Sequence, residues 1–413
     1  MLTPPTLPLP IRVFNALGRG ARRSGLGTRL DPDTLIETAR TKTGLSDFGE
    51  GPHASELGIL CDALEREANL TSFGRFIVRK QLLEGLEIQL QVQDWFRRYP
   101  EIAQQPIARP IVIIGMPRTG TTILHELMAL DPQIRVPESW EVARPTPPPE
   151  AASYAQDPRI QQMEKHLEGF EQVIPDVRRI HRMGARLPQE CVAITGYVFN
   201  GMMWPVLFRI PTYARRQQGA ADFAGAYRFH RRFLQLLQWR NPRTRWVLKS
   251  PGHLWSLPAL MREYPDACLV QTHRDPLKIE SSNTSLTTVF RKMASDVVDP
   301  HGIAREWSEY LMHALNASHR FRASGAIPAG QALDVQFKAF MAKPAAVVRE
   351  IYARFGLAYP DDMDACIAAY IADNPADKHG VHKYHWEDTG LSYEGERDKA
   401  RPYQEYFQVQ SEF

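Results

Sequence analysis

The sequence is poor in the features that mark secreted, zinc-bound or membrane-spanning proteins. Only four cysteines occur in 413 residues, and none has C-x-x-C spacing. We therefore expect reduced, mostly buried thiols rather than disulfides or a zinc site. No apolar run is long enough to cross a bilayer, and the proline-rich first ten residues do not suit the apolar helix of a signal peptide. These absences predict a cytoplasmic protein without a membrane span.

The charges are nearly balanced, because the net charge is only +3. Such a value argues against nucleic acid as the principal partner. The 43% of hydrophobic residues is enough for a sizeable core. The length predicts two or three domains, or one large α/β domain with additions, and a homodimer is one assembly that this composition allows. The spacing of His379, His382 and His385 matches no usual zinc pattern, so we predict no metal.

The most informative stretch is a glycine-containing turn between a predicted strand and a predicted helix. The β-branched residues Ile111–Ile114 predict a buried strand, and a helix is expected to begin after Thr122. Backbone N–H groups of such a turn, together with a helix N-terminus, can bind a phosphate. The turn nearly matches G-x-x-x-x-G-K-[ST], but Thr121 stands where triphosphate hydrolases have lysine. The turn therefore predicts a site for one phosphate and its substituent, with Arg118 supplying positive charge.

Short apolar strands then alternate with helices along the chain. Strands are predicted at 111–114, 246–248, 268–272 and 332–335, and helices at 120–130, 253–264, 276–288, 303–320 and 345–355. This alternation predicts an α/β fold in which helices flank a central, P-loop-type parallel sheet. Residues 1–105 are expected to be an N-terminal helical region, with 1–30 loosely structured. Residues 106–413 are expected to form the catalytic domain, with a helical insertion at 145–242.

Two further strands are followed by cations. Lys249 follows the second strand and His253 comes after a Pro-Gly turn, while Arg274 follows the third strand with Ser282 eight residues later. Ligands of open α/β sheets bind at the carboxyl ends of the strands. A guanidinium group also suits bidentate phosphate binding. The structural alternatives are a solvated lysine at a strand end and an arginine paired with Asp275.

A carboxylate and a basic loop complete the set of candidates. Glu138 follows the first helix by a short turn, and it could accept a proton from an attacking hydroxyl near the phosphate. Lys378, His379 and Gly380 belong to a basic stretch near the C-terminus. We expect that stretch to close on an anion.

Taken in order, these clusters resemble those of sulfotransferases that use 3′-phosphoadenosine 5′-phosphosulfate (PAPS). The resemblance rests on Pro117-Arg-Thr-Gly-Thr-Thr122, on Leu248-Lys-Ser-Pro251, and on Arg274-Asp-Pro276 followed by Ser282. It spans roughly residues 110–390 and is closest to a bacterial branch that also resembles tyrosylprotein sulfotransferases around the loop. The helices before the loop, including Leu70–Arg75, resemble those of the same branch.

The resemblance implies a role for each matching residue. The 5′-phosphosulfate would be held by the loop, which comprises Pro117, Arg118, Thr119, Gly120, Thr121 and Thr122. Arg274 and Ser282 would hold the 3′-phosphate, and Lys249 would lie near the bridging oxygen. The stretch from Lys378 through His379 to Gly380 would correspond to a basic segment near the C-terminus of the cytosolic enzymes.

The catalytic base has two candidates. Glu138 falls where the tyrosylprotein branch keeps its catalytic glutamate. Cytosolic enzymes use a histidine two residues after a lysine, whereas His253 lies four residues after Lys249. The resemblance therefore favours Glu138 and keeps His253 as the alternative.

The implied activity is in-line transfer of the sulfuryl group from PAPS to an acceptor hydroxyl, an EC 2.8.2 type of reaction that leaves adenosine 3′,5′-bisphosphate. Arg118 and Lys249 would neutralise the developing charge, so that no divalent metal is required. Apolar and aromatic residues at 197–208, together with Tyr213, favour a lipophilic alcohol or phenol as acceptor. The alternatives are a P-loop nucleotide kinase or phosphotransferase, and a non-catalytic nucleotide-binding protein.

Overall fold

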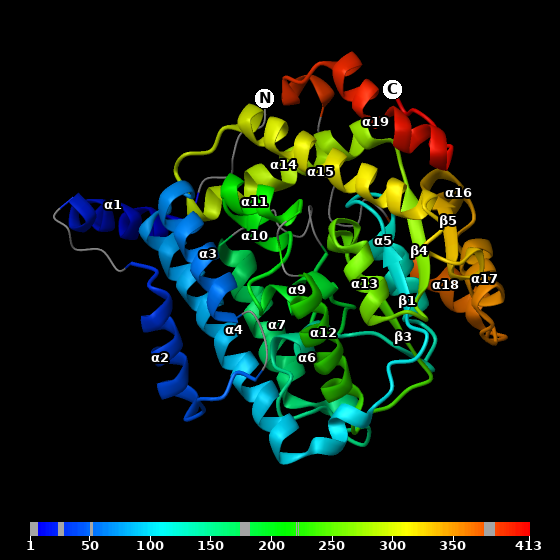
Figure 1. Ribbon diagram of the computed structural model, residues 1–413, viewed down its shortest axis with the longest axis horizontal. Helices are drawn as coiled ribbons and strands as arrows, with labels where there is room; N and C mark the ends of the chain where they lie inside the picture. The colour runs from blue at the N-terminus through cyan, green and yellow to red at the C-terminus, as the bar shows by residue number, and fades with distance from the viewer. Residues whose placement is uncertain are drawn as a thin grey trace.

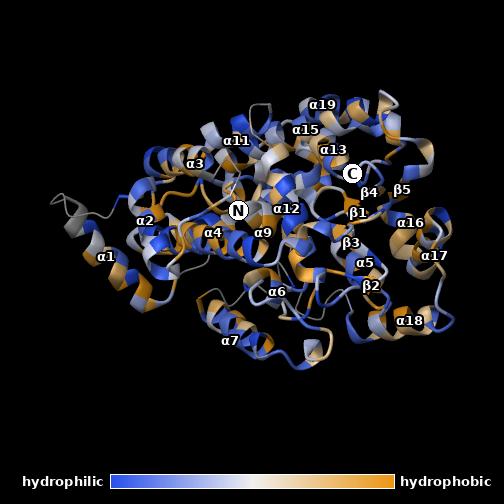
Figure 2. Cartoon of the chain, turned by 60° about the horizontal axis from the view of Figure 1, so that its bottom comes forward, coloured by the Kyte–Doolittle hydropathy of each residue, from blue (hydrophilic) through white to orange (hydrophobic). Residues whose placement is uncertain are grey.

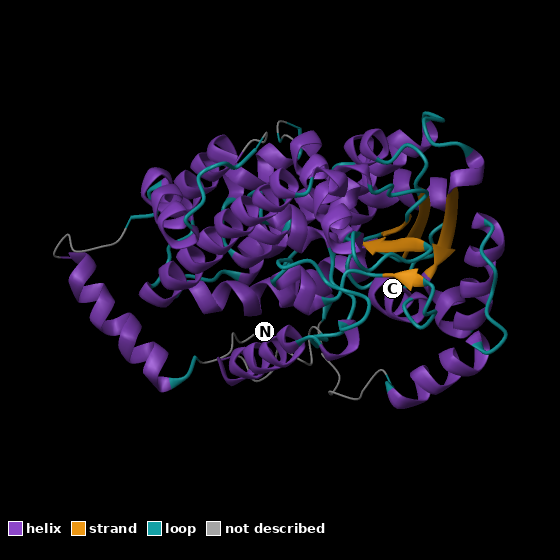
Figure 3. Cartoon of the chain, turned by 90° about the horizontal axis from the view of Figure 1, so that it is seen from below, coloured by secondary structure: helices purple, strands orange, loops and turns teal. Residues whose placement is uncertain are grey.

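The computed structural model describes residues 7–23, 29–49, 53–173, 182–219, 221, 223–375 and 385–413. These residues form one five-stranded sheet, which lies toward one end of the molecule, and helices make up most of the remainder (Figures 1 and 3). The strands are β1 (Ile111–Ile114), β2 (Ile134–Arg135), β3 (Arg245–Lys249), β4 (Cys268–His273) and β5 (Ala332–Gln336).

The sheet is parallel throughout, with the strand order β2-β3-β1-β4-β5. Its central strand β1 is buried along its whole length, and its side chains alternate between two cores. Val112 and Ile114 pack on one face, while Ile111 and Ile113 pack on the other. Continuous apolar strands are expected where helices cover both faces. The predicted α/β fold with a central parallel sheet is thereby confirmed.

Helices that follow β1 in the chain cover the sheet. They are α5 (Thr121–Met128), α13 (Leu257–Glu263), α14 (Pro276–Ala294), α15 (Pro300–Ala323), α16 (Phe337–Ala342), α17 (Pro344–Phe355), α18 (Met363–Asp373) and α19 (Tyr393–Phe407). Short 3₁₀ helices lie at Pro251–Trp255 and Trp386–Thr389. The helix over 345–355 ends at Gly356, which adopts the left-handed conformation with φ 69°. Glycine is favoured there because it lacks the Cβ that other residues would strain.

Four helices precede the sheet: α1 (Leu9–Arg23), α2 (Pro32–Thr43), α3 (His53–Glu67) and α4 (Ser72–Arg98). Helix α2 begins at the predicted place, since the Asp31 carboxylate accepts a 2.8 Å hydrogen bond from the Thr34 amide. The expectation of loose structure across 1–30 is wrong for α1. That helix has apolar residues at helical spacing (Leu9, Val13 and Leu17), which outweigh its two glycines. In the described part of the chain, no helix has the length and apolar character needed to span a bilayer.

Helix α6 (Ser139–Ala143) lies just before residues 145–242, where the insertion is predicted. The described part of that range contains α7 (Pro158–Val173), α9 (Cys191–Gly196), α10 (Met203–Leu207), α11 (Pro211–Gln217) and α12 (Phe223–Gln238). Four of its large aromatic residues are buried in a core. Phe199, Trp204, Phe208 and Tyr213 are at most 3% exposed and pack in one core with α3 and α4. Burial of these rings stabilises the contact between the insertion and the N-terminal helices. The four cysteines are free, and three of them are buried.

Candidate functional site

The predicted site residues follow three adjacent strands. Strand β1 lies between β3 and β4, and all three run in the same direction. Their carboxyl ends therefore meet at one edge of the sheet. Gly115 follows β1, Lys249 ends β3 and Arg274 follows β4. Residues more than 150 positions apart in the sequence are thus brought to the same edge.

The loop between β1 and α5 is shaped to approach an anion closely. Gly115 has φ 150°, and a Cβ added there would lie 2.2 Å from the hydroxyl oxygen of Thr272 on β4. The Thr119 hydroxyl donates to the Met116 carbonyl at 2.7 Å and lies 2.6 Å from the same Thr272 hydroxyl. The loop is therefore tied to the sheet by buried hydroxyls. Helix α5 begins directly after Gly120, so its N-terminal N–H groups are available to an anion in the loop.

Lys249 is brought to this loop. Its side chain is 2% exposed, and its ammonium nitrogen lies 3.3 Å from the Thr122 hydroxyl. The same ammonium group forms an ion pair with Glu190, which directly precedes α9. Lys249 is therefore a buried lysine, and the alternative of a solvated lysine at the strand end is wrong. Glu190 was not found from the sequence, because 59 residues separate it from Lys249.

Arg274 is also brought to the loop. Its Nη1 donates to the Arg118 carbonyl at 3.0 Å, and its guanidinium lies 4.1 Å from the centre of the Phe337 ring. The rest of the guanidinium binds both carboxylate oxygens of Glu412, at 3.0 and 3.1 Å. Asp275, the alternative partner, instead binds Arg397 at 2.8 and 3.1 Å.

Glu412 therefore binds the guanidinium of Arg274, the group that the resemblance assigns to the 3′-phosphate. Glu412 is held there because its amide donates to Asp275 at 2.6 Å. Ser282, the other residue predicted for the 3′-phosphate, is buried on α14. Arg118 itself is exposed, with φ 70°.

Glu138 lies at the start of α6. Its carboxylate accepts a 2.8 Å hydrogen bond from the Trp140 indole and lies 3.4 Å from the guanidinium of Arg186. Burial raises the pKa of this carboxyl, and the neighbouring charge of Glu141 raises it further. The backbone before Glu138 pairs with the backbone before Glu190, since the Gln189 amide donates to the Pro137 carbonyl at 2.7 Å. Glu138 and Glu190 therefore lie on neighbouring segments.

His253 occupies a different environment. It is 2% exposed, and its Nδ1 lies 2.7 Å from the Tyr227 hydroxyl. Its ring also stacks on Tyr227, with centroids 5.7 Å apart, and meets His230 edge-on at 6.4 Å. Burial lowers the pKa of His253 to about 3, with a smaller effect of His230. The structure thus holds His253 as a neutral side chain in a buried aromatic cluster.

Three of the remaining predicted residues lie outside what the structure describes. Lys378, His379 and Gly380 belong to residues 376–384, which are not among the described residues. Pro117 and Thr121 lie in the loop and at the first position of α5. The described part of the predicted site therefore comprises the loop, Lys249, Arg274, Ser282 and Glu138.

This arrangement can be compared with known proteins. The sulfotransferase family matches residues 110–361. The crystal structure of sulfotransferase STF1 from Mycobacterium tuberculosis H37Rv is 30% identical with a TM-score of 0.79, over 89% of this chain and 97% of that chain. The structure of sulfotransferase STF9 from Mycobacterium avium is 26% identical with a TM-score of 0.84, over 92% and 97% of the two chains. None of the curated protein sequences matches this chain.

Proposed function

The chain belongs to the sulfotransferase family and is a PAPS-dependent enzyme, and we propose that it transfers the sulfuryl group to the hydroxyl of a lipophilic alcohol or phenol. The observation that carries the proposal is the convergence of the three motifs on one loop. Lys249 reaches Thr122 at 3.3 Å from one side, and Arg274 reaches the Arg118 carbonyl at 3.0 Å from the other. A kinase would need a lysine in place of Thr121 to reach a triphosphate.

The residues around the loop are suited to an anionic donor. Gly115 lets the loop pack closely against Thr272 of β4, and the N–H groups of the loop and of α5 would bind the 5′-phosphosulfate. Arg274 and Ser282 would bind the 3′-phosphate. When bound, PAPS supplies a sulfuryl group on an activated phosphate, and the product nucleotide is adenosine 3′,5′-bisphosphate.

Charge stabilisation falls to Lys249 and Arg118. Lys249 is buried, so its charge acts in a medium of low polarity and is stronger than in water. Glu190 orients the ammonium group through the ion pair and keeps it next to Thr122. Arg118 is exposed at the loop and is free to close over the anion. These two cations would neutralise negative charge on the leaving oxygen.

Glu138 is the base that we favour over His253. A carboxylate with a raised pKa is a stronger base than an ordinary one. His253 has a strongly lowered pKa and a buried ring, so it binds a proton poorly. The Trp140 indole fixes the Glu138 carboxylate at 2.8 Å. The acceptor proton would pass to this carboxylate as the new bond to sulfur forms.

The test combines a variant with a binding measurement. Glu138→Gln keeps the size of the side chain but cannot take a proton, so turnover should fall by about 100-fold or more. Calorimetry with adenosine 3′,5′-bisphosphate should give nearly the same affinity for both proteins, because Glu138 is assigned to the acceptor.

Three results would count against this proposal. Equal turnover of the Glu138→Gln variant and the parent protein would remove Glu138 as the base. Tighter binding of ATP than of adenosine 3′,5′-bisphosphate would contradict the assigned donor and favour a kinase. Binding of the bisphosphate without transfer to any phenol would favour a non-catalytic nucleotide-binding protein.

A further inference from the structure

Helix α1 packs on the protein through a narrow face that contains Asn15 and the half-buried Ile11. It stands at one edge of the molecule, beside α4 (Figure 1). Its Asn15 is 3% exposed, and the side-chain oxygen accepts a 2.9 Å hydrogen bond from the Phe73 amide. Arg19 forms a 3.0 Å ion pair with Asp296. An ordinary surface helix buries its apolar face and exposes its polar one. In α1, by contrast, the fully buried side chain is an asparagine, and most of the large apolar side chains point to solvent.

The apolar residues of α1 are exposed instead. Leu9 and Leu17 are 66% and 73% exposed, and Val13 and Phe14 are each 49% exposed. Leu9, Val13 and Leu17 are spaced four apart, so they share one side of the helix. Figure 2 shows α1 at the margin of the molecule, with hydrophobic segments along it.

Neighbouring segments extend this apolar surface. Phe76 is 59% exposed, and it lies one turn after Phe73, which donates to α1. Val297 is 62% exposed and directly follows Asp296, the ion-pair partner of α1. Six of the nine large hydrophobic side chains exposed in the described residues therefore gather here. We call the six the α1 patch: Leu9, Val13, Phe14, Leu17, Phe76 and Val297. A concentration of this kind marks a surface that contacts another apolar body.

The charge of α1 indicates which kind of apolar surface the α1 patch contacts. The helix sequence contains four arginines and no acidic residue. A helix with an apolar face and only basic charges is typical of segments that lie at the surface of an anionic membrane. A second copy of this chain would bring the same arginines to the contact, and the nearby carboxylate of Asp296 is already paired with Arg19. We propose that the α1 patch docks on an anionic lipid surface.

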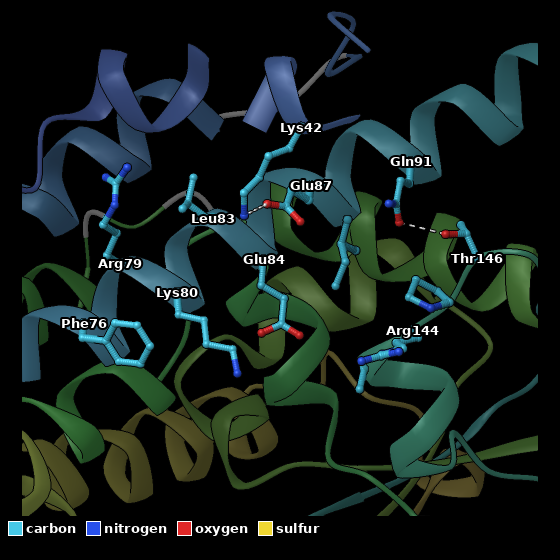
Figure 4. A pocket seen from close by; sticks show the side chains of 13 residues that line it. Lys42, Phe76, Arg79, Lys80, Leu83, Glu84, Glu87, Gln91, Arg144 and Thr146 are labelled. Carbon is cyan, nitrogen blue, oxygen red and sulfur yellow. Dashed lines mark hydrogen bonds and ion pairs between the residues drawn. The ribbon is translucent and has the colours of Figure 1, made fainter. Parts of the chain in front are cut away.

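A cavity opens next to the patch. It has a volume of about 590 Å³ and lies between α4 and the segment that follows α6 (Figure 4). Phe76 belongs to both the patch and the cavity wall. The wall is lined by Lys42, Phe76, Arg79, Lys80, Leu83, Glu84, Glu87, Ile88, Gln91, Ala143, Arg144, Pro145 and Thr146. The volume is in the usual range for small-molecule sites.

The cavity wall combines apolar and cationic groups. Four cations line the cavity: Lys42, Arg79, Lys80 and Arg144 (Figure 4). Of these, Lys42 forms a 3.0 Å ion pair with Glu87. Such a lining suits an amphiphile that carries an apolar body and a polar or anionic group. Helix α6 runs from Ala143 in the wall back to the residue after Glu138. On the proposed function, the cavity would admit a lipophilic acceptor from the bilayer toward the base.

Vesicle sedimentation tests the docking surface without any donor or acceptor. The full chain should bind vesicles of phosphatidylcholine with 30% phosphatidylglycerol and should bind pure phosphatidylcholine much more weakly. Leu17→Ser should reduce partitioning by about tenfold or more, because a leucine no longer enters the bilayer. Arg12→Ala should reduce it about fivefold, and salt should weaken binding to the anionic vesicles.

A matched control removes an exposed apolar residue elsewhere. Met341 is 42% exposed on α16, and Met341→Ser should leave partitioning unchanged. Equal binding by the Leu17→Ser variant and the parent protein would overturn the proposal. So would a dimer in solution that Leu17→Ser converts to a monomer while vesicles fail to bind, since the patch would then contact a second copy.

The role of the cavity has a separate readout. Transfer to a long-chain phenol carried in anionic vesicles should fall in the Leu17→Ser variant, while transfer to a water-soluble phenol should not change. Loss of both activities in the variant would contradict a role confined to docking. If the parent protein transferred to neither phenol, the proposed function would fail, whereas the sedimentation result would still decide the docking surface.

Discussion

The buried ion pair between Arg135 and Glu141 should be one of the most sensitive points of the fold next to the site. Their side chains are 3% and 0% exposed, and they are joined by two hydrogen bonds of 2.7 and 2.6 Å. The Glu141 carboxylate also accepts the amide of Glu138 at 2.9 Å. The pair therefore connects β2 to the start of α6, where the proposed base lies.

Glu141→Gln keeps the shape of the side chain and leaves the guanidinium of Arg135 buried without its counter-charge. Removal of one partner of a buried pair costs about 3–5 kcal/mol of unfolding free energy. The exposed pair of Arg240 and Glu150 provides the control, with exposures of 41% and 54%. Glu150→Gln should cost less than about 1 kcal/mol, because solvent screens that pair.

Urea unfolding followed by tryptophan fluorescence measures both variants. The midpoint should fall clearly for Glu141→Gln and hardly at all for Glu150→Gln, with similar slopes. Replacement of both buried partners, as in Arg135→Met with Glu141→Leu, should recover much of the loss, because no buried charge remains. Equal midpoints for the two single variants would refute the reasoning.

Two further predictions concern unusual carboxylates. Glu412→Gln should strengthen binding of adenosine 3′,5′-bisphosphate several-fold in calorimetry, because the carboxylate that occupies Arg274 would no longer compete with a phosphate. Glu405→Gln on the exposed side of α19 is the control, and weaker binding by the Glu412 variant would show that Glu412 orients Arg274 instead. Glu280 is 1% exposed, and neither of its carboxylate oxygens has a hydrogen-bond partner among the described residues. Burial raises the pKa of this carboxyl well above 4.5. Between 4.5 and that raised pKa the folded protein keeps a proton that the unfolded chain has lost, so stability falls as pH rises. Glu280→Gln should therefore raise the urea midpoint more at pH 8 than at pH 5, and an equal change at both would contradict the assignment.

Local patterns in the sequence predicted the sheet that carries the site. Four apolar strands were expected within one or two residues of their observed bounds, since buried parallel strands are short, continuous apolar runs. Strand β2 was missed because Ile134–Arg135 is too short to show a periodicity. Helix α1 was missed because the prolines before it and the glycines within it favour loose structure, although Leu9, Val13 and Leu17 have helical spacing.

The partners of the charged side chains could not be read from the sequence. Glu190 meets Lys249 across 59 positions, and Glu412 meets Arg274 across 138. No periodicity connects such residues, because their distance depends on how separate segments pack. The same holds for His253, which the sequence kept as the alternative base despite its different spacing from Lys249, and whose ring lies among Tyr227 and His230.

Short stretches of the sequence thus predict the residues that bind the donor, whereas they do not predict the ion pairs that those residues form. A strand, a glycine turn and a helix N-terminus are local structures, so Gly115 to Thr122 predicts an anion site without knowledge of the rest. Which carboxylate accompanies each cation depends on long-range packing, because a buried charge takes the partner that the fold brings within a few ångströms. The pKa of Glu138 and the direction that the apolar face of α1 takes follow from the same packing.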